Sequence, residues 1–283
     1  MQGFFIYNGK FYNDDETVIG PDNRSFRYGD GLFETMRLSN GRIPLAAYHF
    51  ERLFAGLQLL RFDIPKHFTT SFLAEQIQKL CIKNKAEKAA RVRLNVFRGN
   101  GGLFDPDNLR PNYIIQCMPL DEDKLQWNEN GLLVDVFADG RKTCDRFSSL
   151  KSNNYLLYAM AALHAKKNQL NDCLVLNIRD RVADSTIANV FLVKENHIYT
   201  PPLSEGCVAG VMRRYLIEKL QVSGEAGYKF EERQVTVREL EKADEVFLTN
   251  AFYGIKWVKE FAGKRYGNTV SRLLYNEIVK KLF

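Results

Sequence analysis

Apolar residues in the first third of the chain recur at helical spacing in two places. In residues 44–61, Leu53 and Leu57 mark one side of a predicted helix, and residues 69–84 repeat the pattern. The N-terminal residues 1–12 are apolar in places and predict a strand. The first part of the chain should therefore combine strands with two amphipathic helices.

Residues 91–97 alternate apolar and polar side chains, as a half-buried strand does. The apolar side chains would face a core. The opposite face would carry Arg93 and Asn95, because side chains two residues apart in a strand point the same way.

A polar stretch at residues 121–127 predicts a linker between a smaller N-terminal α/β domain (1–120) and a larger C-terminal domain (128–283). In the second domain we expect strands from about Leu132 and at 173–178, 189–193 and 245–248, and helices at 153–167 and 211–221. Helices and strands mixed in this way indicate the α+β or mixed α/β class.

With 283 residues and 45% hydrophobic content, the chain can bury a substantial core. No apolar run approaches the roughly 18 residues that a membrane helix needs, and residues 1–12 lack the features of a signal peptide. Five widely spaced cysteines without a Cys-x-x-Cys pair predict reduced thiols and no metal site. A cytoplasmic enzyme is the simplest expectation.

The formal net charge of +6 raises the question of nucleic-acid binding. Lysine and arginine are interleaved with aspartate and glutamate almost everywhere, which favours a solvated, mildly basic surface. The two commonest glycine-rich nucleotide-binding loops are missing from the sequence. We expect no nucleic-acid partner and no membrane partner.

Lys151 stands in Ser-Leu-Lys-Ser-Asn-Asn-Tyr, at the head of the helix predicted for residues 153–167. A helix N-terminus and a partly apolar site both favour a neutral, nucleophilic amine. Taken alone, Lys151 would be read as a solvated lysine. Its sequence neighbours change that interpretation.

Four further segments, in their order and spacing, join the Lys151 segment in a pattern that resembles the class IV aminotransferases across essentially the whole chain. They are Arg-Tyr-Gly-Asp-Gly-Leu-Phe-Glu-Thr-Met-Arg (27–37), His-Phe-Glu-Arg-Leu (49–53), Val-Ala-Asp-Ser-Thr-Ile-Ala-Asn-Val-Phe (182–191) and Glu-Gly-Cys-Val-Ala-Gly-Val-Met-Arg (205–213). This family has fold type IV and includes branched-chain aminotransferases, D-amino acid aminotransferases and aminodeoxychorismate lyases.

The resemblance implies pyridoxal 5'-phosphate as the cofactor and Lys151 as the residue that carries it and moves the substrate proton. It implies that Arg52 and the backbone N–H groups of Val211 and Met212 contact the cofactor phosphate. Asp184, which we expect at a hairpin-like turn in residues 181–186, stands where family members usually have glutamate, and is expected to keep the pyridine nitrogen protonated.

Two further expectations follow from the same resemblance. Asn250 would lie near the phosphate and Tyr155 near the cofactor ring. His49 is expected to be a packing or hydrogen-bonding residue.

The residues expected to bind the substrate are Phe33, Arg37 and Arg93, and Thr35 is expected to place a hydroxyl near the catalytic lysine, as lyases of the family often do. Leu103 stands where D-amino acid aminotransferases have a carboxylate trap, which argues against their specificity. The predicted reaction is that of 4-amino-4-deoxychorismate lyase, which releases pyruvate and forms 4-aminobenzoate. The alternative is a branched-chain amino acid aminotransferase that uses 2-oxoglutarate.

The resemblance also implies a homodimer that acts on a small amino substrate. A non-enzymatic cofactor binder on the same fold is a rival hypothesis, supported only by Asp184.

Overall fold

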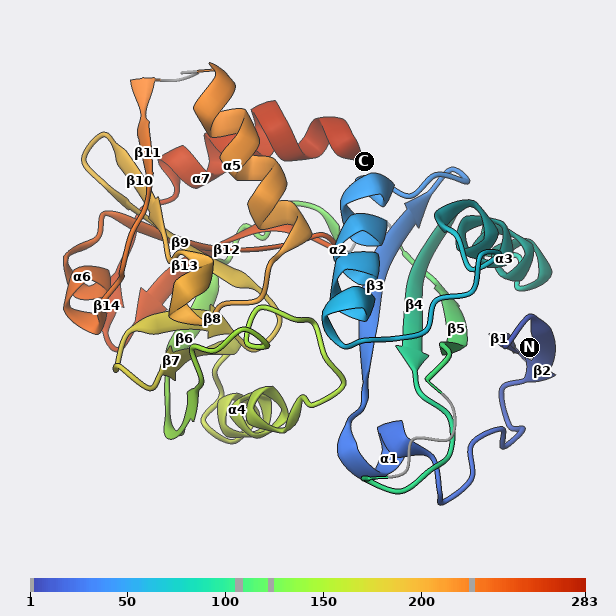
Figure 1. Ribbon diagram of the computed structural model, residues 1–283. Helices are drawn as coiled ribbons and strands as arrows, with labels where there is room; N and C mark the ends of the chain where they lie inside the picture. Colours follow the sequence, from blue (N-terminus) through green and yellow to red (C-terminus); the bar gives the residue numbers. More distant parts are fainter. Residues whose placement is uncertain (1–2, 105–108, 122–124, 224–226) are drawn as a thin grey trace. The chain divides into compact units, whose positions relative to one another are not determined.

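The computed structural model describes residues 3–104, 109–121, 125–223 and 227–283 (Figure 1). Contacts within the chain divide it into two compact units. Unit 1 comprises Met1–Lys124 and Lys151–Tyr155, and unit 2 comprises Leu125–Leu150 and Leu156–Phe283. The linker predicted at 121–127 stays a prediction, because residues 122–124 lie outside the described part.

Unit 1 is built on a five-stranded antiparallel sheet with the order β2-β1-β5-β4-β3. Its strands are β1 (Phe4–Tyr7), β2 (Lys10–Asn13), β3 (Gly31–Ser39), β4 (Ala89–Phe97) and β5 (Asn112–Pro119). The N-terminal strand expected from the sequence is instead a hairpin of β1 and β2. Asn8 and Gly9 make its turn with positive φ angles of 47° and 82°, as tight hairpins require.

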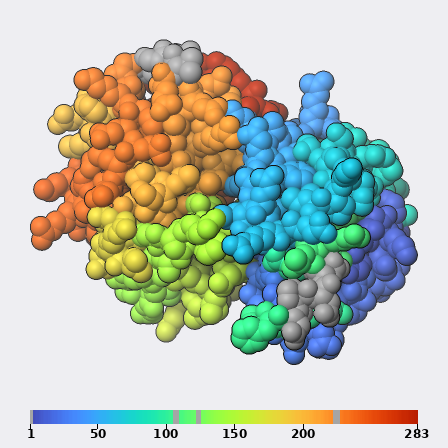
Figure 2. All heavy atoms as spheres, in the orientation of Figure 1, coloured from blue at the N-terminus to red at the C-terminus, as the bar shows by residue number. Residues whose placement is uncertain are grey.

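Two of the helices of unit 1 cover one face of this sheet: α2 (Ala46–Leu59) packs on β3, and α3 (Thr70–Lys83) packs on β5 and β1. The structure confirms both predicted helices. Their inner sides are apolar and include Leu53, Leu57 and Leu73. Their outer sides form part of the surface in Figure 2. A third helix, α1 (Arg24–Tyr28), is a short turn before β3.

The alternation predicted for β4 is confirmed. Val92, Leu94 and Val96 are fully buried. Arg93 and Asn95 are partly exposed and point to the other face. The sheet of unit 1 thus has a helix-covered face and an opposite face, on which we find the odd-numbered side chains of β3 and β4.

Unit 2 contains the second sheet, with the order β11-β10-β9-β12-β13-β6-β7-β8 and β14 paired to β13. Because β8 also pairs with β9, the six strands β9, β12, β13, β6, β7 and β8 form a closed barrel. Its strands are β6 (Leu132–Lys142), β7 (Asp172–Asn177), β8 (Val182–Ser185), β9 (Asn189–Lys194), β10 (His197–Thr200), β11 (Lys229–Glu232), β12 (Glu245–Asn250), β13 (Gly254–Phe261) and β14 (Lys264–Arg265).

The core of unit 2 consists of aliphatic and aromatic side chains from these strands, among them Leu174, Val190, Leu248 and Phe261. Helix α4 packs on β6 and β7, and α5 packs on β12 and β11. The helices of unit 2 are α4 (Leu156–Lys167), α5 (Val211–Ser223), α6 (Val237–Lys242) and α7 (Thr269–Leu274), with short helical turns η2 (Leu203–Glu205), η4 (Tyr275–Val279) and η5 (Lys280–Leu282). The mixed α/β class expected from the sequence is confirmed.

Two local expectations were wrong. The helix expected from residue 153 begins at Leu156, because the backbone before it pairs with β3: the N–H of Asn153 donates to Gly31 O at 2.9 Å. Asp184 lies within strand β8 rather than at a turn, since Val182–Ser185 pairs with β7.

No helix in the described ranges is long and apolar enough to cross a membrane. The same residues contain no group of three histidine, cysteine, aspartate or glutamate side chains that could hold a metal ion. All five cysteines are free thiols.

Candidate functional site

Lys151 lies in an extended segment beside the edge of β3. The N–H of Phe33 donates to Lys151 O at 2.9 Å, and Leu32 forms a bridge with Ser152. The Lys151 ammonium lies 4.4 Å from the centre of the Phe33 ring. The expected helix-dipole effect on Lys151 is wrong, because the helix that follows it begins only at Leu156, and an aromatic contact takes its place.

Phe33 brings three of the predicted site residues together. Its ring meets Tyr155 edge to face, with ring centres 5.4 Å apart, and Arg93 lies over it, with Cζ 4.0 Å from the ring centre. Lys151 Nζ is also 5.7 Å from the Tyr155 ring centre. An amine and a guanidinium therefore contact the same aromatic ring.

Thr35 and Arg37 follow Phe33 at two-residue steps on β3 and share its face of the sheet. Thr35 pairs directly with Arg93 across the two strands. Arg37 is buried and lies opposite Arg91 in the register of β3 and β4. This face therefore gathers cationic side chains around a threonine hydroxyl.

Arg52 lies on α2, over the helix-covered face, where it forms an ion pair with Glu34. Arg52 Nε donates to Glu34 Oε1 at 2.8 Å and Nη2 donates to Oε2 at 2.5 Å. The ring of His49 lies 2.7 Å from Glu34 Oε2 through Nδ1. Glu34 is thus held by two side chains of α2, and the expectation that His49 makes hydrogen bonds is consistent with this contact.

Burial alone would raise the pKa of Glu34, but the charge of Arg52 and the contacts with His49 outweigh it and lower the pKa to about 2. Burial lowers the pKa of His49, against the opposing pull of Glu34. Glu34 is therefore a carboxylate near neutral pH, and His49 is neutral there.

Asp184 lies in unit 2, where it is 2% exposed and accepts four hydrogen bonds. Oδ2 accepts from Lys142 Nζ at 3.0 Å, from the Tyr158 hydroxyl at 2.8 Å and from the N–H of Val208 at 2.9 Å. Oδ1 accepts from Asn189 Nδ2 at 2.9 Å. Oδ1 thus accepts one of the four hydrogen bonds and Oδ2 accepts three, so Oδ1 is the oxygen with room for a further donor. That arrangement fits a protonated ring nitrogen.

The other cofactor candidates lie in the same unit. Val211 and Met212 are the first residues of α5 and their side chains are buried, so only their backbone could serve a ligand. The first N–H groups of a helix have no partner within it and suit a phosphate. The side chain of Asn250 is occupied by a turn: Oδ1 accepts from the N–H groups of Phe252 and Tyr253, both at 3.0 Å.

Residues 31–261 match the family model of the amino-transferases of class IV. The chain belongs to the class IV aminotransferase family. A branched-chain aminotransferase of the archaeon Thermoproteus uzoniensis, solved with norvaline, has the same fold, with a TM-score of 0.87 at 21% identity over 100% of this chain and 95% of that one.

Members of this family bind pyridoxal phosphate or its amine form. A further branched-chain amino acid aminotransferase was solved with pyridoxamine 5'-phosphate. It matches with a TM-score of 0.87 at 20% identity, over 100% of this chain and 94% of that one.

Two curated members of the family differ in activity. An aminodeoxychorismate lyase of Vibrio harveyi is 29% identical over 85% of this chain and 86% of its own. A D-alanine aminotransferase of Bacillus licheniformis is 27% identical over 93% of this chain and 90% of its own. The family alone therefore does not determine the reaction, which has to be inferred from the residues of the site.

The sequence analysis assigned no site role to four residues: Glu34, Lys142, Tyr158 and Asn95. Glu34 lies within one of the family segments, but its partner is 18 residues away on another element. Lys142 and Tyr158 reach Asp184 from 42 and 26 residues away. Only the alternation in β4 gave a signal, for Asn95.

Proposed function

We propose that this class IV enzyme is a pyridoxal-phosphate-dependent 4-amino-4-deoxychorismate lyase. The observation that carries the proposal is the contact of Lys151 and Arg93 with one ring, that of Phe33. An amine that can hold the cofactor thus lies near a guanidinium that can bind a carboxylate of the substrate. Thr35, paired with Arg93, and the lyase among the relatives support this reaction.

In this proposal Lys151 holds the cofactor covalently, Arg52 and the backbone of Val211 and Met212 bind its phosphate, and Asp184 receives the hydrogen bond of its ring nitrogen. Bound there, the cofactor supplies an electron sink. Tyr158 and Lys142 keep the Asp184 carboxylate in place. Asn250 would lie near the cofactor phosphate, and Tyr155 near the cofactor ring.

The chain's own residues then act on the substrate. Arg93 and Arg37 bind its carboxylates. The Lys151 amine takes the proton from the carbon that carries the substrate nitrogen. Cleavage of the bond between the neighbouring ring carbon and the ether oxygen then releases enolpyruvate, which takes up the proton from Lys151 and becomes pyruvate. Loss of the ring proton and of enolpyruvate makes the ring of 4-aminobenzoate aromatic. The Thr35 hydroxyl lies on the face of Lys151 and can hydrogen-bond the group that leaves.

The test is a comparison of two reactions with the purified protein. We expect 4-aminobenzoate and pyruvate in equal amounts from aminodeoxychorismate. With leucine, isoleucine or valine and 2-oxoglutarate, we expect glutamate to form more slowly than 4-aminobenzoate does. Rapid glutamate formation without 4-aminobenzoate would instead assign the branched-chain aminotransferase reaction. A yellow protein inert to every amino substrate would be a cofactor binder.

We predict that Asp184→Asn keeps the cofactor but loses turnover. The amide can still hydrogen-bond the ring nitrogen but cannot compensate its positive charge. Hydrogen bonds to charged groups contribute about 1.5–3 kcal/mol, which corresponds to roughly a tenfold to hundredfold fall in kcat. Cofactor content is measured by absorbance after alkaline release. Native turnover in Asp184→Asn would place the electron-sink partner elsewhere.

The homodimer implied by the family resemblance is part of the same proposal. Sedimentation velocity of the purified protein measures it directly, with a mass of twice 32.7 kDa expected.

A further inference from the structure

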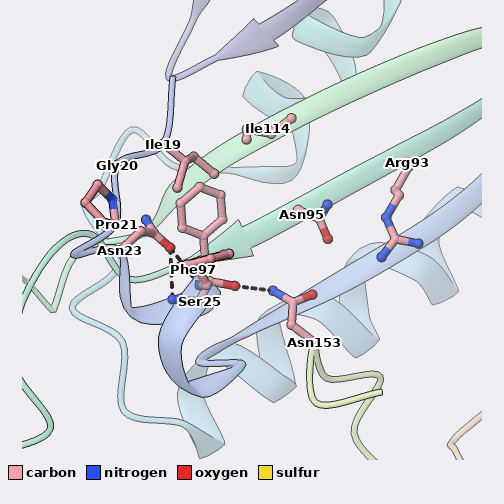
Figure 3. A pocket seen from close by; sticks show the side chains of 11 residues that line it. Ile19, Gly20, Pro21, Asn23, Ser25, Arg93, Asn95, Phe97, Ile114 and Asn153 are labelled. Atoms are coloured by element: carbon pink, nitrogen blue, oxygen red, sulfur yellow. Dashed lines mark hydrogen bonds between the residues drawn. The ribbon is translucent and has the colours of Figure 1, made fainter. Parts of the chain in front are cut away.

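Unit 1 contains a pocket of about 640 Å³ on the face of its sheet that the helices α2 and α3 leave uncovered (Figure 3). Its walls come from β4, β5, the residues around α1 and the segment after Lys151. Apolar side chains such as Phe97 and Ile114 form one part of the lining. The polar part of the lining consists of Asn23, Ser25, Arg93, Asn95 and Asn153.

The strand register places this pocket beside Lys151. Ile114 pairs with Asn95, and Asn95 pairs with Phe33, so the three side chains form one row across the sheet. Phe33 in turn hydrogen-bonds the backbone of Lys151 on its other side. The row that carries the candidate catalytic amine therefore ends in the pocket.

Gly31 leaves space for the pocket in the neighbouring row of the sheet, because it has no side chain. It pairs with Phe97 on one side and its carbonyl accepts from the N–H of Asn153 on the other. A Cβ at Gly31 would lie 2.6 Å from Asn153 Nδ2 and 2.8 Å from Phe97 Cβ, which is too close for a side chain. Asn153 Nδ2 donates to Ser25 Oγ at 2.9 Å and so borders the hollow without filling it (Figure 3).

Two polar side chains in this pocket lack hydrogen-bond partners among the described residues. The contact of Arg93 there is the stacking on Phe33, and burial is the main cause of its lowered pKa. Asn95 Oδ1 is buried and accepts no hydrogen bond from the described part of the chain. No described residue therefore fixes the Asn95 amide, and Arg93 is partly exposed, so both side chains can donate hydrogen bonds to a ligand in the pocket, Asn95 through Nδ2.

The two groups would contact different points of one ligand. They are two residues apart on one strand, which separates their Cα atoms by roughly 7 Å. Arg93 suits a carboxylate. The Nδ2 of Asn95, a hydrogen-bond donor, suits an oxygen of a second carboxylate, and the apolar walls suit a flat body between the two.

We propose that Asn95 is a specificity-determining residue: with Arg93 it selects a flat substrate that carries two carboxylates over a branched-chain amino acid with one. This inference rests on the proposed function for the identity of the site, and it names the substrate class. It predicts that discrimination is lost when the amide of Asn95 is removed.

The first test measures binding rather than turnover, with isophthalate as the flat dianion and benzoate as the matched monoanion. Calorimetric titration of the purified enzyme should show isophthalate binding at least about tenfold tighter than benzoate. Asn95→Leu should reduce that preference about tenfold. Gln116→Leu is the matched control, because Gln116 is an exposed amide next to Arg93 on β5 but outside the pocket lining.

A second variant guards against a folding defect. Asn95→Asp keeps the size of the side chain and should repel the dianion, so isophthalate affinity should fall while the melting temperature stays near the native value. The same variants should raise KM for aminodeoxychorismate with little change in kcat. Equal affinity for both probes in the native enzyme, or native isophthalate affinity in both Asn95 variants, would overturn the inference.

The outcomes separate this inference from the proposed reaction. A protein that forms 4-aminobenzoate, yet whose Asn95 variants keep native KM and probe affinity, retains the lyase assignment and loses the role of Asn95. A protein without lyase activity whose isophthalate binding depends on Asn95 retains the dianion pocket and loses the lyase assignment.

Discussion

Lys151→Ala should abolish the visible absorbance of bound cofactor and reduce turnover by about a hundredfold to ten-thousandfold or more, the range that a positioned proton-transfer group contributes. The residue is both the covalent anchor and the proton carrier in the proposed reaction. The fold should survive, because the segment pairs with β3 through its backbone, and the substitution keeps the backbone carbonyl that accepts from the N–H of Phe33. Absorbance, turnover and circular dichroism are measured on the same sample.

Lys167→Ala is the matched control for Lys151→Ala. Lys167 is an exposed lysine at the end of α4, so its loss should change neither colour nor rate. Borohydride reduction followed by peptide mapping adds a direct check. A reduced adduct on any lysine other than Lys151 would contradict the assignment.

The sequence predicted those parts of the fold that local patterns determine. Alternation in β4 put Arg93 and Asn95 on one face, and the helical spacing of Leu53 and Leu57 located α2. Non-local pairing explains the failures. The backbone around Lys151 is extended because it pairs with β3, more than a hundred residues earlier in the chain, and a local helix signal could not show this.

In the candidate site, too, local patterns indicated some residues, and contacts between distant parts of the chain were not predicted. The family segments and the strand pattern pointed to Lys151, Phe33 and Arg93, which the structure brings together in unit 1. Glu34 was not predicted as a partner of Arg52, because their ion pair joins two elements at no regular spacing. Sequence patterns therefore pointed to side chains within the family segments but not to the contacts that join one element to another.

The pair of Glu34 and Arg52 leads to the second large expected effect, on stability. Glu34 is 1% exposed and Arg52 is its cationic partner through both oxygens. Arg52→Ala would leave a buried carboxylate without that partner, which costs about 3–5 kcal/mol. Measured in cofactor-free protein, the free energy of unfolding should fall by that amount, whereas Arg52→Met combined with Glu34→Gln should lose much less.

The pH dependence of stability distinguishes this ion pair from simple loss of packing. Because the folded-state pKa of Glu34 is about 2, below the ordinary value of 4.5, its stabilisation is present above about pH 4.5 and is lost as pH falls through about 2. A shift of this size corresponds to about 3 kcal/mol. Urea unfolding at steps from pH 7 to pH 3 should therefore show the free energy of unfolding of the native protein falling relative to that of the Glu34→Gln, Arg52→Met variant below about pH 4.5. If the difference between the two proteins stays constant over that range, the Glu34 carboxylate is not the charged partner of Arg52, and the lost stability of Arg52→Ala comes from packing alone.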